Sequence, residues 1–260
     1  MWLFNEMFKS KRWDYDIYIE ARFNVLNNVK NIESKIITSE DFILPFIGVK
    51  KKLNKGIKEV KLLYRVSRNG DSTQFHKKCD GVINTVTFVK AKNGRKFGGF
   101  ANKGWDSSNH YIGDDKAFLF SYYYYECYFY NSGNNWIYGS SSYGPFWGFG
   151  HDLYLASGCL SNNSSTTNQS GSYNYNGKND ALNGGSNFQA EDYETYELIL
   201  QYIIYFLFCN TIVLFFVFYF KYYLGWRLGI RPIPQSQQNT LIILKNVKVD
   251  NYVYWVLKLQ

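Results

Sequence analysis

Two runs of strand-forming residues on either side of Asn93-Gly94 constrain the fold more than any other feature of the chain. The run TVTFVKA begins at Thr85, and the run RKFGGFA ends at Ala101. Asn-Gly is the favoured dipeptide of a type I′ turn, because both residues tolerate positive φ angles. The sequence therefore predicts an antiparallel hairpin over residues 85–101.

Four further stretches have the composition or the alternation of strands. They are Val60–Val66, Ala117–Tyr122, His151–Ala156 and Tyr193–Leu198, and a sharp turn is expected at Asn69-Gly70, after the first of them. Together with the hairpin, these stretches predict antiparallel sheets.

Short helices are expected before and between the strands. Tyr15–Val29, within a lead-in segment of residues 1–33, has a loosely helical spacing of apolar residues. A second helix over Asp41–Phe46 should be capped by Ser39 and limited by Pro45, because proline disrupts a helix interior.

A third helix should be capped by Asp71 or Ser72 and should end at Gly81. Phe75 and Cys79 are four residues apart and should share one face of it. Near the other end of the chain, residues 161–180 read SNNSSTTNQSGSYNYNGKND. This composition predicts a mobile loop, at about residues 160–180, that builds no packed core.

The chain is basic, with 29 Lys and Arg against 21 Asp and Glu and a net charge of +8. An anionic partner such as nucleic acid or lipid would reward clustered cations. The lysines are dispersed along the sequence, at Lys9–Arg12, Lys50–Lys61 and Lys90–Lys96. We therefore expect a solvated face and no nucleic-acid partner. The abundance of Lys, Asn, Ile, Tyr and Phe also indicates an A/T-rich genome, such as a protist's.

The cysteines give no sign of a disulfide framework, a cofactor or a redox motif. Cys79, Cys127, Cys159 and Cys209 are far apart and form no C-x-x-C pair. This usage favours a reducing compartment.

A metal site can be weighed from His76 and Cys79, which are three residues apart on the third expected helix. His151 or Asp152 could complete the site, but no second motif of matching spacing exists. The simpler interpretation is a surface His76 and a buried Cys79, with no metal.

Five sequence blocks, taken in order, resemble those of a TLDc domain over residues 34–198. The blocks read LLYRVSRNGDSTQFHKKCDG, KFGGFANKGW, DDKAFLFS, SSYGPFWGFGHDLYLA and NFQAEDYETYEL. The resemblance implies an α+β fold, in which two antiparallel sheets form a β-sandwich with a few flanking helices. It also implies a role in protection against oxidative stress. Several family members bind the vacuolar proton pump, the V-ATPase, and no settled catalytic mechanism is implied.

The motif residues of these blocks have a mostly structural interpretation. Gly98 and Gly99 within a strand suggest a bulge or a close backbone approach, as do Gly148 and Gly150 before His151. Trp105 and Phe118 should be core anchors, because large aromatic rings bury the most area. One core between two sheets is expected to contain Val86, Phe88, Phe97, Phe118 and Leu119.

Candidate catalytic groups are few. His151 and Asp152 lie in GFGHDLYL, but no nucleophile elbow accompanies them. Asp192 and Glu194 are two residues apart in a strand and should share a face, so they could form a functional acidic patch. The alternative is a capping or salt-bridge role. A weak hydrolytic or thiol-dependent enzyme is the second functional hypothesis, and it would use Cys79 or Cys127.

An uncharged apolar run from Leu198 to Phe220 departs from the family pattern. As a helix, its 23 residues would span about 34 Å, enough to cross a bilayer. We expect a single-pass membrane helix within residues 199–224, a sharp switch from strand to helix near Leu198, and a tail of residues 225–260.

Two further observations bear on this run. The first residues of the chain do not form a secretory signal, so the TLDc-like domain should face the cytosol. The lysines and arginines after the run conflict with that topology. The alternatives are a buried apolar helix, or a tail that arises from a gene-model error, in which case the protein would be soluble and cytoplasmic.

Overall fold

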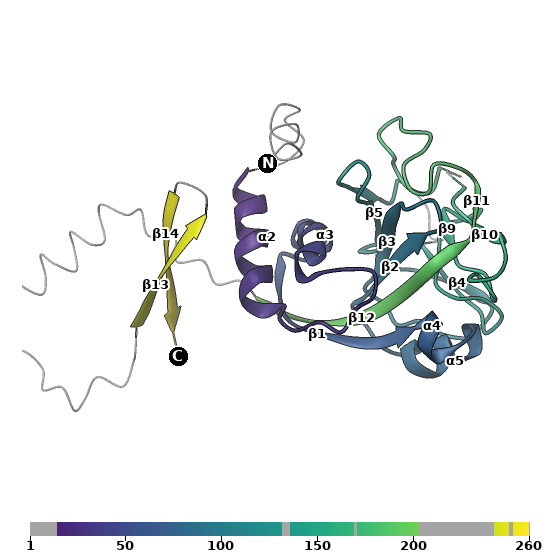
Figure 1. Cartoon of the computed structure of the whole chain (residues 1–260), viewed down its shortest axis with the longest axis horizontal. Helices are drawn as coiled ribbons and strands as arrows, with labels where there is room; N and C mark the ends of the chain where they lie inside the picture. The colour runs from purple at the N-terminus through teal and green to yellow at the C-terminus, as the bar shows by residue number, and fades with distance from the viewer. Residues whose placement is uncertain (1–14, 132–135, 169–170, 203–241, 250–251, 260) are drawn as a thin grey trace, which may run out of the picture. The chain divides into compact units, whose positions relative to one another are not determined.

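The computed structural model describes residues 15–131, 136–168, 171–202, 242–249 and 252–259. The chain divides into two units, Met1–Ile203 and Ile204–Gln260. Within the first unit, two antiparallel six-stranded sheets and a few helices form an α+β fold, as the sequence predicted. Helices α2 and α3 lie on one side of the first sheet, and the second sheet lies on the other side (Figure 1).

The first sheet has the strand order β1-β12-β2-β3-β5-β6, with every neighbouring pair antiparallel. Its strands are β1 (Lys55–Arg65), β2 (Thr85–Ala91), β3 (Lys96–Ala101), β5 (Phe118–Ser121), β6 (Glu126–Phe129) and β12 (Ala190–Tyr202). Strand β12 is the longest and lies between β1 and β2. The expected hairpin is confirmed as β2 and β3.

The turn of that hairpin differs from the expected type I′ geometry. Gly94 has a φ of +86°, whereas Asn93 does not adopt a positive φ. The amide of Gly94 donates to the carbonyl of Ala91, and the amide of Ala91 donates to the carbonyl of Arg95. Lys92 thus belongs to a three-residue loop, in which only the glycine needs the left-handed region.

The second sheet has the order β11-β10-β9-β8-β7-β4 and consists of short strands. They are β4 (His110–Ile112), β7 (Ile137–Gly139), β8 (Phe146–Trp147), β9 (Leu153–Tyr154), β10 (Ser165–Thr166) and β11 (Asn187–Phe188). The stretch expected as a strand over His151–Ala156 contains only the two residues of β9.

The lead-in helix is α2 (Tyr15–Asn28), close to its expected range. It is followed by the 3-10 helix η1 (Ser39–Phe42) and by α3 (Ile43–Leu53). Asp41 accepts a hydrogen bond from the amide of Thr38 at 2.8 Å, so the capping residue is Thr38, and not Ser39 as predicted.

The predicted limit at Pro45 is also wrong, because α3 continues to Leu53. Pro45 is the third residue of α3. In the first turn of a helix the amide has no intrahelical partner, so proline is tolerated there.

Two short helices follow β1. They are α4 (Val66–Asn69) and α5 (Ser72–Cys79). Asp71, one of the two expected capping residues, is the N-cap of α5, and the helix ends at Cys79, two residues before the expected Gly81. Phe75 and Cys79 are both buried on one face, as predicted. His76 is buried as well, so its expected surface position is wrong.

The first sheet separates two hydrophobic clusters, and this corrects the prediction of one core. Phe97 and Leu119 face the second sheet, together with Trp105. The other cluster lies under α2 and α3 and contains Val86, Phe88 and Phe118. Adjacent residues of a strand point to opposite faces, so Phe118 and Leu119 cannot share one cluster.

Residues 161–180 contribute to the core, contrary to the expectation for a polar loop. The segment contains β10, and Tyr173 and Tyr175 are buried in the cluster between the sheets. The hydroxyl of Tyr173 donates to the carbonyl of Trp136 at 2.9 Å. The described part of this segment therefore packs into the core through its two tyrosines, although its composition is otherwise polar.

Strand β12 runs beyond the expected end at Leu198 and reaches Tyr202. Residues 199–202, the first of the expected membrane helix, are extended and pair with the start of β1. The remainder of that predicted helix lies outside the described residues. In the described part of the chain, no helix has the length and apolarity needed to cross a membrane.

The second unit contains a β-hairpin that the sequence analysis did not anticipate. Strands β13 (Ile242–Val249) and β14 (Tyr252–Leu259) pair antiparallel within the predicted tail. They form a separate two-stranded sheet.

Candidate functional site

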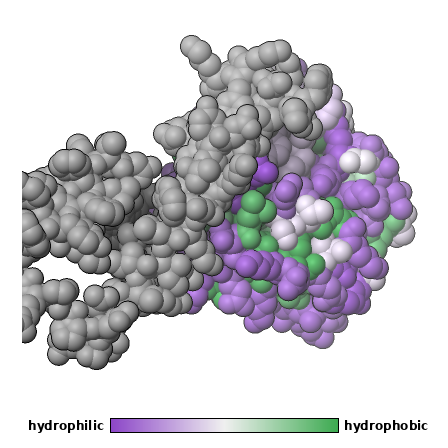
Figure 2. All heavy atoms as spheres, turned by 60° about the vertical axis from the view of Figure 1, so that its left-hand side comes forward, coloured by the Kyte–Doolittle hydropathy of each residue, from purple (hydrophilic) through white to green (hydrophobic). Residues whose placement is uncertain are grey.

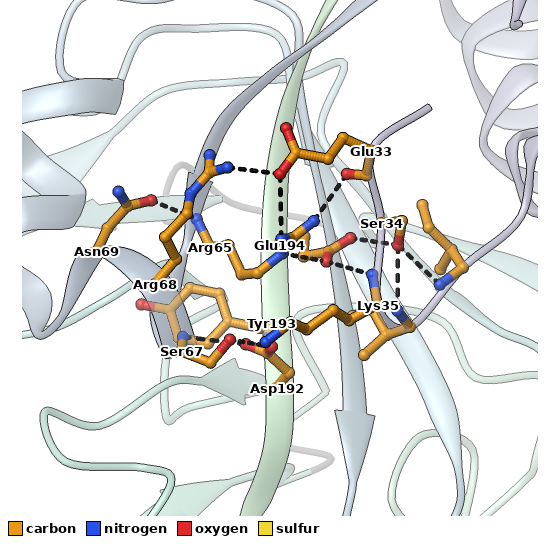
Figure 3. Close-up of polar contacts among 12 residues, drawn as sticks. Glu33, Ser34, Lys35, Arg65, Ser67, Arg68, Asn69, Asp192, Tyr193 and Glu194 are labelled. Atoms are coloured by element: carbon orange, nitrogen blue, oxygen red, sulfur yellow. Dashed lines mark hydrogen bonds and ion pairs between the residues drawn. The ribbon is translucent and has the colours of Figure 1, made fainter. Parts of the chain in front are cut away.

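A buried ion pair joins the end of β1 to β12, where Arg65 and Glu194 face each other in register. The Nε atom of Arg65 lies 2.6 Å from Oε1 of Glu194 (Figure 3). Both side chains are almost inaccessible to solvent. Such a pair is stable only when the remaining polar atoms also have partners, because each ion has lost its hydration.

Those partners come largely from the segment that precedes η1. Glu194 accepts hydrogen bonds from the Ser34 hydroxyl at 2.6 Å and from the Lys35 amide at 3.0 Å. Arg65 donates through Nη2 to the carbonyl of Glu33 at 2.8 Å. The hydroxyl of Tyr196 completes the shell around Glu194 at 2.7 Å. The ion pair therefore fastens residues 33–35 to the first sheet.

Asp192 supports the adjacent helix α4. Its carboxylate accepts hydrogen bonds from the amide and the hydroxyl of Ser67, which lies in the first turn of α4 (Figure 3). It also accepts one from the amide of Tyr193. Asp192 and Glu194 are both buried and satisfied inside the protein, and neither presents a carboxylate to solvent. This geometry matches the capping and salt-bridge alternative.

Gly98 and Gly99 allow neighbouring backbone and aromatic rings to approach β3 closely. A close approach was one of the two roles expected for these glycines, and a bulge was the other. A Cβ at Gly98 would lie 2.0 Å from the Thr87 carbonyl oxygen, and one at Gly99 would lie 2.6 Å from the Trp147 ring. The register of β3 with both neighbouring strands is regular here, so the alternative of a bulge does not apply. Gly99 therefore lets the first sheet approach Trp147 of the second sheet, whereas Gly98 makes room for Thr87 and Phe120 within the first sheet.

The GFGHD segment forms a tight loop between β8 and β9. Gly148, Gly150 and His151 have φ angles of +79°, +86° and +72°. A Cβ at Gly148 would lie 2.1 Å from the Asp152 carboxylate, which is fully buried and accepts from the Tyr175 hydroxyl. Asp152 thus fixes the inner side of the loop. Phe149 is left 61% exposed at its tip.

Phe149 belongs to an aromatic face on the second sheet. We define this face by Tyr111, Tyr138, Phe146, Phe149, His151 and Tyr154. Tyr111 lies beside Tyr138 at 4.9 Å and beside Phe149 at 5.9 Å between ring centroids. Phe146 contacts His151, which stacks on Tyr154 at 5.1 Å.

The aromatic face was not among the features predicted from the sequence. A signal for it exists in the dipeptides Ile137-Tyr138, Phe146-Trp147 and Leu153-Tyr154. One member of each is in the cluster between the sheets, and the other belongs to the aromatic face. Outward positions of a sheet are usually polar, so a row of rings there is informative.

The described cysteines are poor nucleophiles. Cys79, Cys127 and Cys159 are buried free thiols. Burial raises the pKa of Cys79 and of Cys127, and it raises the pKa of Cys159 to about 12. Only an exposed thiolate with a low pKa would react readily.

His76 and Cys79 do not form a metal pair. The His76 ring lies between the Asp80 carboxylate at 2.6 Å and the Tyr143 carbonyl oxygen at 3.0 Å, which ties α5 to the loop before β8. No cluster of potential metal ligands exists among the described residues. Trp105 and Phe118 are fully buried, in agreement with their expected role as core anchors.

A family model described as the TLDc domain matches residues 30–199, well over half of the chain. The chain belongs to the TLDc family. The matched range agrees with the expected domain over residues 34–198. Strand β12 of the TLDc domain ends at Tyr202, three residues beyond the end of the matched range. No curated protein matches the chain.

Helix α2 precedes the TLDc match but packs into the cluster under the first sheet. Ala21 and Val25 are fully buried there. The amide of Ile57, at the start of β1, donates to the Asn24 side chain at 3.0 Å. The lead-in helix is therefore part of the packed TLDc unit.

Proposed function

We propose that this TLDc domain is a non-catalytic protein-interaction module that acts in protection against oxidative stress by binding a subunit of the V-ATPase. The observation that carries the interaction role is the aromatic face, on which Phe149 and His151 are exposed and the three tyrosines are half-buried. Aromatic residues are enriched at protein interfaces, because they bury a large area at a low cost in side-chain entropy. The stress role and the proton pump are proposed from the family.

The construction of the GFGHD loop supports this role. Three features shape the backbone on either side of Phe149. Gly148 and Gly150 have positive φ angles, and the side chain of Asp152 is buried. A preorganised aromatic side chain loses little freedom when a partner covers it. The loop is thus suited to present one ring as an anchor.

The alternative of a thiol-dependent or hydrolytic enzyme finds less support. Cys79 and Cys127 are buried, and their pKa values are raised by that burial. Asp192 and Glu194 are occupied by structural hydrogen bonds. A general acid or base would need to reach a substrate, and these carboxylates do not reach the surface.

We further propose that residues 203–220, the part of the apolar run beyond β12, hold the TLDc domain at a membrane on its cytosolic side. What supports this is the uncharged apolar sequence of these residues and their position directly after β12, in which Leu198–Tyr202 remain paired with β1. Carbonate extraction of the full chain and of a version stopped after Tyr202 provides the test. If the full chain is extracted as easily as the shorter one, the anchor is excluded.

The interaction role is tested by replacing the exposed ring. Cells that lack the gene should become sensitive to peroxide, and the wild-type chain should restore survival. We expect Phe149→Ser to fail in this rescue and to lose co-purification of V-ATPase subunits. Tyr123→Ser is the matched control, because Tyr123 is equally exposed at 58% but lies in the turn between β5 and β6.

The outcomes separate the parts of the proposal. Rescue by Phe149→Ser at wild-type levels would exclude the aromatic face as the binding surface. Normal survival of the disrupted strain at all peroxide doses would exclude the role in stress protection. If Phe149→Ser fails to restore survival but still co-purifies with V-ATPase subunits, the aromatic face binds a different protein partner.

A further inference from the structure

One end of the first sheet gathers lysines that are dispersed in the sequence. At this end β1 begins, β12 ends, β2 begins, β3 ends and β5 begins. We define the lysine end by Lys52, Lys55, Lys103 and Lys116, together with the exposed apolar residues Ile83 and Tyr202.

Contacts within the sheet place these residues at the same end of it, where Tyr202 lies four residues beyond Leu198 along β12. Lys55 faces Tyr202 in register, and its Nζ atom lies 5.1 Å from the centre of the Tyr202 ring. The amide of Asn84, next to Ile83, donates to the carbonyl of Asn102, next to Lys103. The carbonyl of Asn84 in turn accepts from the amide of Leu198 in β12.

The charges at the lysine end are mostly not neutralised. Lys52, Lys55 and Lys103 form no ion pair within the described part of the chain, whereas Lys116 pairs with Asp115 at 2.6 Å. The pKa of Lys52 is lowered by burial and by the nearby charge of Lys116. At the opposite end of the sheet most cations are paired, in Lys90–Glu191, Arg95–Asp180 and Lys96–Asp41, and among the described residues only Lys92 of the hairpin turn lacks an ion pair there.

Two apolar side chains stand among these cations. Ile83 is 56% exposed and Tyr202 is 78% exposed. On the face of the domain that Figure 2 shows, apolar patches are bordered by hydrophilic residues. Exposed apolar side chains surrounded by lysines are typical of surfaces that lie on an anionic bilayer.

We propose that the lysine end docks the TLDc domain on the surface of an anionic lipid bilayer. Its lysines would bind headgroup phosphates, and Ile83 and Tyr202 would enter the interfacial region. The apolar run continues from Tyr202, so the lysine end lies where the chain leaves the sheet. The inference goes beyond the proposed anchor, because it assigns a lipid-binding surface to the folded domain itself.

The test is amide hydrogen exchange on the full chain in nanodiscs of phosphatidylcholine, with or without about 30% phosphatidylserine. Each lysine near such a surface contributes about 1 kcal/mol, roughly a fivefold effect, so we expect exchange around residues 83, 103 and 116 to slow by about tenfold or more in the anionic discs. High salt should abolish this protection, because it screens exposed charges.

Two triple variants with the same net charge localise the effect. Lys52→Gln/Lys55→Gln/Lys103→Gln should lose the lipid-dependent protection. Lys77→Gln/Lys78→Gln/Lys92→Gln, at exposed lysines of α5 and of the hairpin turn, should retain it. Exchange of the β2 amides, which lie in the core, reports whether each variant is folded.

Equal exchange in the two kinds of disc would overturn the inference, and so would equal loss in both variants. The same protection from added single-stranded RNA would indicate a general polyanion surface, and would also overturn it. Carbonate extraction tests the anchor separately. If carbonate extracts the full chain but its amides stay protected on anionic discs, the anchor is excluded and the docking surface is retained.

Discussion

Arg65 and Glu194 form an ion pair that connects three separate parts of the chain, because Glu194 also holds Ser34 and Lys35. Removing Arg65 would leave the buried Glu194 without its cation, and removing Glu194 would leave the buried Arg65 only the exposed carboxylate of Glu33, 3.5 Å away, as an ionic partner. The TLDc family match begins at residue 30, just before the segment that this pair fastens.

Glu194→Gln should therefore destabilise the fold by about 3–5 kcal/mol, the usual cost of an uncompensated buried charge. Chemical denaturation with a two-state fit gives the free energy of unfolding. Glu59→Gln is the control, because Glu59 lies on β1 but is exposed. A loss below about 1 kcal/mol for Glu194→Gln, similar to that of a surface pair, would contradict this role.

Phe118→Ala should cost about 3–5 kcal/mol, because it empties a position in the cluster under α3. The Phe118 ring also lies where a Cβ at Gly48 would be, at 2.3 Å. Gly48→Ala should thus destabilise by about 1–3 kcal/mol through overpacking, although alanine favours a helix. Adding Phe118→Leu should recover part of this loss, and a double-mutant cycle measures the coupling.

Gly148 and Gly94 provide a matched pair of glycines with positive φ. A Cβ at Gly148 would meet Asp152, whereas a Cβ at Gly94 would meet nothing within 4 Å. Gly94→Ala should cost about 1 kcal/mol of backbone strain, and Gly148→Ala should cost more, because the Asp152 side chain must also move. Thermal unfolding checks the order, and equal costs would mean that the loop around Gly148 adapts freely.

Stability should fall at alkaline pH because of buried thiols. Burial raises the pKa of Cys159 from 9.0 to about 12, so folding favours its protonated form. This contribution is complete below pH 9 and is lost as the pH rises from 9 towards 12. Between pH 8 and pH 10 the wild type should lose about 1.4 kcal/mol more than Cys159→Val does. Equal pH slopes for the two chains would show that Cys159 titrates normally in the fold.

Thiol labelling tests the enzyme alternative directly. In a Cys209→Ser background, Cys79, Cys127 and Cys159 should react with a maleimide only at the rate of unfolding, because all three are buried. Added denaturant should accelerate the labelling in parallel with unfolding. Rapid labelling of Cys79 or Cys127 in the native state would revive the thiol-dependent hypothesis.

Local signals in the sequence predicted the elements better than their assembly. The β2–β3 hairpin, helix α2 and the buried face of α5 follow from spacing that is visible in a single segment. The split of Phe118 and Leu119 between two clusters was also available, because adjacent strand residues alternate. The prediction of a single core ignored that alternation.

Other features depend on contacts between distant segments and could not be predicted from one stretch. His76 is buried because Tyr143, 67 residues later, supplies a carbonyl oxygen for its ring. Lys52 and Lys103 are both at the lysine end only because of the strand order. The aromatic face likewise requires the register of four short strands.

The position of β12 has a mechanical consequence. This strand is hydrogen-bonded on both sides, to β1 and to β2, and a pull on Tyr202 would act along its length. Such a load shears many backbone hydrogen bonds at once, whereas a pull across a sheet would open them one after another. If the chain beyond Tyr202 is held at a fixed surface, the domain is built to resist being torn from it.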